Sequence, residues 1–239
     1  DMRVAAWVGS IDFSDPAAGQ VDGVTMLRQP GSTLKPFLYA LALEQGFTAS
    51  TVLPDVPTDF GGAEVYVPAN FNNQFNGPVR LRQALASSLN IPAVYTLERL
   101  GVSRFSEFLT ELGFDSLRDQ LGGLGLGLAL GNAEVSLYEL VRAYGSFVHG
   151  GQRVVINNGP ACQPAEDPDG APAMDPRIAS LVRDILTRHP DRALAFGLAN
   201  RLRFEGAMKT GTSNQFNNIW AVGFTTDLLG GVWMGNFSG

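Results

Sequence analysis

The C-terminal third of the sequence changes from the spacing of helices to the spacing of strands. EGAMKTGTS (205–213), WAVGFTT (220–226) and GVWMGNF (231–237) are short runs of apolar, aromatic and β-branched residues separated by polar turns. They predict adjacent antiparallel strands within residues 205–237. At the other end of the chain, RVAAWVG (3–9) is a short apolar run that ends at Gly-Ser, and it predicts a further buried strand.

The middle of the chain has helical patterns instead. We expect a helix over about Ser32–Glu44, because Pro36 falls in its first turn and Gly46 follows as a stop signal. The further helical patterns are RLRQALASSL, PAVYTLERL, SRFSEFLTEL, VSLYELVRAYGSFVHG and the segment that begins at Asp175 and Pro176. This order predicts an α+β fold: an antiparallel sheet built from both chain ends, with flanking helices and an inserted all-helical region.

Two segments show neither pattern. Residues 51–77 are rich in Pro, Asn and Gly, and they predict an ordered irregular connection rather than core elements. Residues 157–176 have the composition of a long surface loop within the domain. We therefore expect a single domain over residues 1–239.

Composition excludes several classes of function. Hydrophobic residues make up 45% of the 239 residues and charged residues 17%, which is typical of a globular chain. The net charge of −6 argues against nucleic acid as the main partner. Cys162 is the single cysteine, and His149 and His189 lie outside any motif, so we expect no metal and no cofactor. No apolar run approaches the ~18 residues of a membrane span, and the start at Asp1 suggests a fragment or a processed chain.

Three short motifs carry the chemistry. In the first, Ser32-Thr33-Leu34-Lys35, a serine and a lysine at i and i+3 share one helix face, so a neutral lysine could take the serine proton. This pattern is common by chance. The alternative interpretation makes Ser32 a helix N-cap and Lys35 a solvated side chain.

The second motif is Ser88-Leu89-Asn90, an S-x-N at a predicted helix end, which a helix terminus before Pro92 would also explain. The third is Lys209-Thr210-Gly211-Thr212, which is much rarer and lies on a predicted strand. Such a strand can pair with an extended peptide, and Gly211 would leave room for the approach. Lys209 and the threonine hydroxyls could bind a carboxylate.

The order of the motifs is more informative than any one of them. Ser88 follows Ser32 by 56 residues (88 minus 32), and Lys209 follows Ser88 by 121 (209 minus 88). This is the arrangement of the penicillin-recognising serine acyl-enzymes. The chain resembles the transpeptidase domain of the class A (bifunctional) penicillin-binding proteins, most of all their 1C-type branch. The matching phrases span nearly the whole chain: RQPGSTLKPFLYALALEQG, VLPDVPTDFGG, SLNIPAV, LALGNAEVSLYELVRAYGSFVHGG, FEGAMKTGTSNQFNNIWAVGF and GVWMGNFSG.

The resemblance implies a mechanism. Lys35, kept neutral by burial and by Lys209, takes the proton of Ser32, which attacks the D-Ala-D-Ala bond of a peptidoglycan stem peptide. Ser88 passes a proton to the leaving amine, and an amine from a neighbouring stem resolves the acyl-enzyme into a cross-link.

The remaining roles are implied in the same way. The substrate-binding residues are Asn90, Thr210, Gly211 and Thr212. The backbone N–H groups of Ser32 and Thr212 hold the oxyanion.

The resemblance also implies a setting. β-Lactams would acylate the same serine, and the parent protein would be membrane-anchored, with a glycosyltransferase domain, on the periplasmic side of the inner membrane. Relatives have a closing helix after the last strand and an aromatic residue where this chain has QLGGLGLGLALG. We expect the glycine-rich segment Gly122–Gly131 to be flexible, and it is not a phosphate loop because no Gly-Lys-Ser/Thr follows.

Related activities remain open. A D,D-carboxypeptidase would use the same residues with water as the acceptor, and a non-catalytic β-lactam sensor would stay acylated. A β-lactamase is disfavoured, because the nearest match to its E-x-x-L-N motif, at Glu134–Leu137, is followed by Tyr138.

Overall fold

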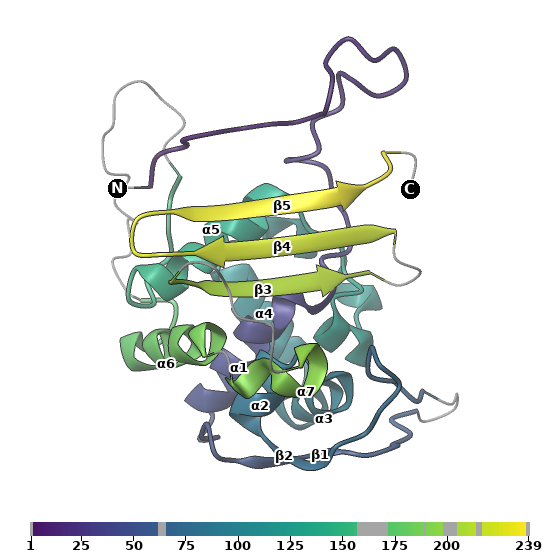
Figure 1. The fold of residues 1–239 in the computed structure, drawn as a ribbon, viewed down its shortest axis with the longest axis vertical. Helices are drawn as coiled ribbons and strands as arrows, with labels where there is room; N and C mark the ends of the chain where they lie inside the picture. The colour runs from purple at the N-terminus through teal and green to yellow at the C-terminus, as the bar shows by residue number, and fades with distance from the viewer. Residues whose placement is uncertain are drawn as a thin grey trace.

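A computed structural model describes residues 2–61, 66–156, 172–188, 190–197, 205–213 and 217–237. It combines helices with antiparallel strands, so the predicted α+β class is confirmed (Figure 1). The strands are β1 (Val52–Asp55), β2 (Gly77–Arg80), β3 (Ala207–Thr212), β4 (Asn218–Phe224) and β5 (Leu229–Gly235). The α-helices are α1 (Lys35–Glu44), α2 (Leu81–Ala86), α3 (Asn90–Leu100), α4 (Val102–Glu111), α5 (Leu137–Val148), α6 (Pro176–Thr187) and α7 (Ala193–Phe196). The 3-10 helices are η1 (Gly31–Leu34), η2 (Asp115–Leu117), η3 (Leu121–Gly123), η4 (Leu126–Leu130) and η5 (Pro190–Arg192).

The C-terminal strands form a three-stranded antiparallel sheet in the order β3-β4-β5, as the sequence predicts. Along β4 the buried side chains alternate with more exposed ones, so Trp220, Val222 and Phe224 face the helices while the opposite face stays more open. Figure 1 shows the sheet across the upper half of the molecule, with most of the helices on the far side of β3 from β5. β3 pairs with β4 alone among the described strands, and it also contacts η1 and α6.

Helix α1 is the centre of the core. Every residue from Lys35 to Leu43 is buried, because the helix is surrounded by packing partners rather than exposed on one face. On it, the Phe37 ring packs against Phe114, Tyr144 and Phe147. The packing around α1 therefore fixes the N-terminal end of the helix, which carries the S-x-x-K motif, against β3.

The predicted strand at residues 3–9 is wrong. Within residues 2–10 the structure assigns a single β-bridge residue, Arg3, and no strand, and Trp7 and Val8 are 42% and 74% exposed. An apolar run forms a strand only where a neighbour accepts its backbone hydrogen bonds, and here the Gly9 carbonyl accepts the Gly23 N–H of its own segment instead. The described sheet thus comes from the C-terminal end, and the N-terminal segment runs along the outer side of β5 in Figure 1.

Residues 51–77 contain an unpredicted antiparallel pair, β1–β2, at the lower end of the molecule in Figure 1. Pro54 lies opposite Pro78, and a proline in each strand concealed both strands in the sequence. The predicted loop at 157–176 falls mostly outside the described residues. In the segment Gly122–Gly131 the structure assigns η3 and η4, and its flexibility stays a prediction. None of the described helices is long and apolar enough to cross a membrane.

Candidate active site

The turn that carries Ser32 is packed tightly against β3. Gly31 has a φ of +59°, and a Cβ there would overlap the Thr212 carbonyl oxygen. On its other side the Gly31 N–H donates to the Gly131 carbonyl at 3.3 Å, and a Cβ at Gly131 would overlap the Gly31 carbonyl. Ser32 itself stays partly exposed while its neighbours Thr33 and Leu34 are buried. The turn is thus closely packed and leaves Ser32 partly exposed.

Two side chains from other elements hold the same turn. The Tyr144 hydroxyl, from α5, donates to the Thr33 carbonyl at 2.7 Å. The Trp220 indole N–H, from β4, donates to the Gln29 carbonyl at 2.8 Å. Both rings are buried, so these hydrogen bonds are shielded from competing water.

Lys35 lies at the first position of α1 and is fully buried. Its backbone N–H donates to the Ser32 carbonyl, so the two motif residues share one turn. Burial and then the charge of Lys209 hold the pKa of Lys35 well below its usual range, in the predicted direction. The amine has three acceptors within the S-x-N segment: Ser88 O at 2.8 Å, Leu89 O at 3.0 Å and Asn90 Oδ1 at 2.6 Å.

A neutral amine has two N–H donors and one lone pair. Loss of the proton from Lys35 therefore releases one of the three contacts and leaves a lone pair on the amine. The neutral Lys35 amine can then accept a proton on this lone pair. The burial of Lys35 and its lowered pKa suit a lysine that works as a base.

Ser88 connects the two lysines. It lies between α2 and α3 with a φ of +57°, which is uncommon for a residue other than glycine. Its carbonyl accepts from Lys35, while its hydroxyl accepts from Lys209 at 2.8 Å. Asn90, the first residue of α3, binds Lys35 through Oδ1 and donates its Nδ2 to the Ala69 carbonyl at 2.6 Å.

Lys209 is in the middle of β3 and is 3% exposed. Its amine also donates to the Thr210 carbonyl at 2.7 Å. Burial, followed by the charge of Arg192, lowers the pKa of Lys209 to about 7. Thr210 and Thr212 alternate with it along the strand and are partly exposed.

Gly211 has a different packing reason from the one predicted. A Cβ there would overlap the Pro30 carbonyl and lie 3.0 Å from the Thr33 nitrogen, both within this chain. The missing side chain admits the turn of Ser32 to the strand. The structure thus brings Ser32, Lys35, Ser88, Asn90 and Lys209–Thr212 together around the contact of η1 with β3.

Sequence reasoning missed three residues of this region. Gly31 was signalled by the Pro-Gly pair before the motif, and Gly131 by the end of the glycine-rich segment. Arg192, which is 6% exposed, had no local signal, because only the fold brings it near Lys209.

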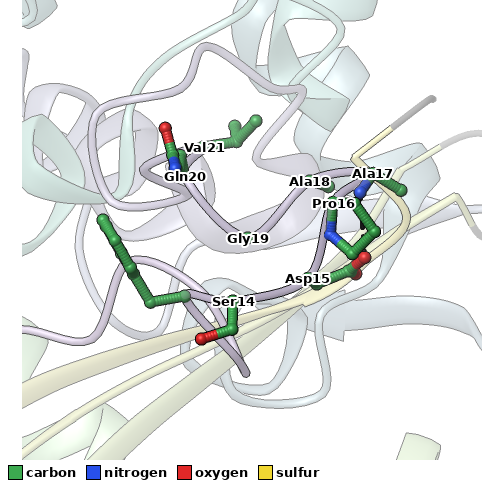
Figure 2. A pocket seen from close by; sticks show the side chains of 9 residues that line it. Ser14, Asp15, Pro16, Ala17, Ala18, Gly19, Gln20 and Val21 are labelled. Atoms are coloured by element: carbon green, nitrogen blue, oxygen red, sulfur yellow. Dashed lines mark hydrogen bonds between the residues drawn. The ribbon is translucent and has the colours of Figure 1, made fainter.

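A surface hollow lies apart from these residues. It is lined by residues 13–21 alone, and Figure 2 shows Ser14 to Val21 around the bend at Gly19. The bend is held by local hydrogen bonds, among them the Gly19 N–H to the Asp15 carbonyl and the Ala17 N–H to the Asp15 carboxylate. It is the concavity of one loop and contains none of the motif residues. Within the described residues no group of three or more His, Cys, Asp or Glu side chains could hold a metal ion.

Comparison with known proteins gives a consistent result. The family model for the penicillin binding protein transpeptidase domain matches residues 12–234. The chain is 36% identical over 245 residues to penicillin-binding protein 1C of Escherichia coli strain K12, covering 100% of this chain and 30% of that protein. It is 35% identical over 248 residues to penicillin-binding protein 1A of Neisseria gonorrhoeae, covering 97% of this chain and 30% of that protein. The chain thus spans about 30% of the length of these curated relatives.

Solved structures resemble the same fold. The crystal structure of penicillin-binding protein 1A from Haemophilus influenzae superposes with a TM-score of 0.74 at 25% identity, over 90% of this chain and 39% of that one. An imipenem acyl-enzyme complex of penicillin-binding protein A from Mycobacterium tuberculosis gives a TM-score of 0.74 at 18% identity, over 93% of this chain and 59% of that one. The second likeness concerns the fold alone.

Proposed function

The chain belongs to the transpeptidase family of the class A penicillin-binding proteins, and on that premise we propose that it is a D,D-transpeptidase that cross-links peptidoglycan stem peptides through an acyl-enzyme on Ser32. The observation that carries the proposal is the convergence of two buried amines on one serine. Lys35 and Lys209 donate to the carbonyl and the hydroxyl of Ser88, at 2.8 Å each, beside the turn that presents Ser32.

Acylation begins with a proton transfer. The Ser32 hydroxyl gives its proton to the neutral Lys35 amine, and its oxygen attacks the carbonyl carbon of the penultimate D-alanine. A tetrahedral intermediate forms with a negative oxygen. The proton passes from Lys35 through Ser88 to the nitrogen of the terminal D-alanine, the C–N bond breaks, and an ester on Ser32 remains.

The negative oxygen needs hydrogen-bond donors. The backbone N–H groups of Ser32 and Thr212 fill this role, and the close packing of Gly31 on the Thr212 backbone supports the pairing. Removal of one such donor typically raises the activation free energy by about 3 kcal/mol.

The substrate binds beside β3. The edge of β3 away from β4 can pair with an extended peptide, and Thr210 and Thr212 receive the terminal carboxylate. The Asn90 Oδ1 accepts from Lys35, and the Ala69 carbonyl accepts one hydrogen of the Asn90 Nδ2. The second hydrogen of Nδ2 orients the donor peptide.

An amine of a neighbouring stem peptide then attacks the ester and regenerates Ser32. With water as the acceptor the same residues would give a D,D-carboxypeptidase, and an acyl-enzyme without turnover would be a β-lactam sensor. β-Lactams acylate Ser32 as substrate mimics. In the parent protein we propose a membrane anchor, a glycosyltransferase domain and a periplasmic location.

The test is labelled penicillin with an intact-mass readout. The wild type should gain one adduct and Ser32→Ala none. A wild type without an adduct, or an equal adduct on Ser32→Ala, would contradict the acyl-enzyme. Turnover of a stem-peptide thioester with and without a D-amino acid acceptor then separates transpeptidase, carboxypeptidase and sensor.

A further inference from the structure

A buried carboxylate is linked to Asn90 by hydrogen bonds through Asn70. Asp55, at the end of β1, is 0% exposed, and the described residues provide it with no ion pair. Its acceptors are filled by amides: Asn70 Nδ2 at 2.8 and 3.0 Å, the Asn76 N–H at 2.9 Å and Asn76 Nδ2 at 2.6 Å. A buried charge is retained only with such partners. None of these residues has a role in the mechanism above.

Asn70 connects this carboxylate to the motif. It is 4% exposed, and its Oδ1 accepts the backbone N–H of Asn90 at 2.7 Å. That N–H is at the first position of α3, where a helix has no acceptor of its own, and Leu89 before it provides no side-chain cap. Asn70 therefore acts as a cap supplied from 20 residues away.

The hydrogen bonds continue to the base. Asn70 is held by Asp55 on one side, and its Nδ2 also donates to the Gln74 carbonyl at 2.8 Å. Asn90, held in turn by Asn70, receives the Lys35 amine on Oδ1 at 2.6 Å. The result is a continuous run of hydrogen bonds, Asp55–Asn70–Asn90–Lys35, in which Asp55, Asn70 and Lys35 are buried and Asn90 is partly exposed.

We propose that Asp55 and Asn70 are positioning residues of this site, which hold Asn90, and through it the Lys35 amine, at the separation from Ser32 that proton transfer requires. The proposal rests on the proposed function. It assigns a role to the segment 55–76, which the three motifs do not include.

The charge of Asp55 gives the proposal a second observable. Two charged groups act on Lys35 from the elements packed against it: Lys209 on β3 lowers its pKa, and Asp55 on β1 raises it. The buried phenol of Tyr39, one turn along α1, has a raised pKa and stays neutral. Loss of the Asp55 charge should therefore lower the pKa of Lys35 further and move the acid limb of the acylation profile to lower pH.

The chain allows this to be measured directly, since Lys35 and Lys209 are its only two lysines. Lysine labelled with 13C at Cε gives two signals, assigned with Lys209→Arg, whose titration reports each pKa without any reaction. Penicillin acylation rates over the same pH range report positioning. The matched control is Asp59→Asn, which removes an exposed carboxylate from the same connection.

For Asp55→Asn we expect the plateau rate of acylation to fall, by up to about 100-fold for a displacement of about 1 Å, and the Lys35 pKa to move down, while Asp59→Asn changes neither. A merely structural role would reduce the fraction of protein that reacts and leave the rate and the pKa of the surviving fraction unchanged. Wild-type values of both in Asp55→Asn would overturn the proposal.

If Asp55→Asn does not fold, the exchange Asp55→Asn with Asn70→Asp keeps the proposal testable. It restores a donor opposite an acceptor and moves the carboxylate one link closer to Lys35, so the Lys35 pKa should rise above the wild-type value. An unchanged or lower pKa, or an exchange variant that also fails to fold, counts against the proposal. A wild type that titrates as expected but gains no penicillin adduct would instead refute the proposed function.

Discussion

Replacement of Lys209 by methionine is expected to remove the contribution of Lys209 to a rise in stability with pH that the wild-type chain should show above pH 7. Lys209 is 3% exposed, and its pKa is lowered to about 7 from an ordinary 10.5, first by burial and then by Arg192. Between these two values the unfolded chain binds more protons at this lysine than the folded chain does. Stability therefore increases with pH across that window.

The size of the rise follows from the two pKa values. The slope approaches about 1.4 kcal/mol per pH unit, so the free energy of unfolding should gain about 3 kcal/mol between pH 7 and 9.5 from Lys209 alone. Lys35 contributes in the same direction. Tyr39 and Tyr144, whose pKa values are raised by burial, act oppositely above about pH 10 and set the upper limit.

The assay is urea unfolding followed by tryptophan fluorescence at pH 7, 8, 9 and 9.5. Arg104→Met, which removes an exposed cation, is the control and should keep the wild-type slope. A wild-type free energy of unfolding that is flat or falls over this range would refute the reasoning, as would a Lys209→Met variant that rises as steeply as the wild type.

Two further substitutions test the turn of Ser32. Gly31→Ala should lose about 2–5 kcal/mol of stability, because of the φ of +59° and the overlap with Thr212, and most penicillin acylation; Gly122→Ala, with nothing within 4 Å, is its control in thermal unfolding. Tyr144→Phe should lose about 1–2 kcal/mol, since the buried Thr33 carbonyl is left without its donor, and should slow acylation; a wild-type unfolding midpoint and rate would contradict the role of this hydrogen bond.

The motif residues could be predicted because each motif is local. Ser32 and Lys35 share a turn, and the spacing of the residues within a motif already limits what they can contact. Lys209 and Ser88 required the order of the motifs along the chain, and their contact at 2.8 Å agrees with that order.

What the sequence could not provide depends on contacts between distant segments. Arg192 reaches Lys209 only through the fold, and Asn70 caps α3 without any local capping signal. The error at residues 3–9 has the same origin, because an apolar run does not reveal whether another strand lies beside it. The prolines at 54 and 78 hid a strand pair whose residues lie opposite each other.

The choice of lysine at this site can be argued from the whole chain. Of the 17 basic residues, 15 are arginine, and both lysines are buried at the site. An arginine stays protonated under all ordinary conditions, so it can supply a fixed charge but cannot take a proton from a serine. Arg192 fits the first role, since its charge helps to lower the pKa of Lys209.

The two lysines then titrate as a coupled pair across Ser88. With Lys209 near its midpoint at pH 7 and the pKa of Lys35 held down by burial and by Lys209, the pair binds fewer than two protons at neutral pH. Loss of the Lys209 proton removes a positive charge near Lys35 and so raises the pKa of Lys35. Lys35 is therefore the stronger base when Lys209 is neutral, whereas a larger fraction of Lys35 is deprotonated when Lys209 is charged. Ser88 lies between the two amines, since its carbonyl accepts from Lys35 and its hydroxyl accepts from Lys209.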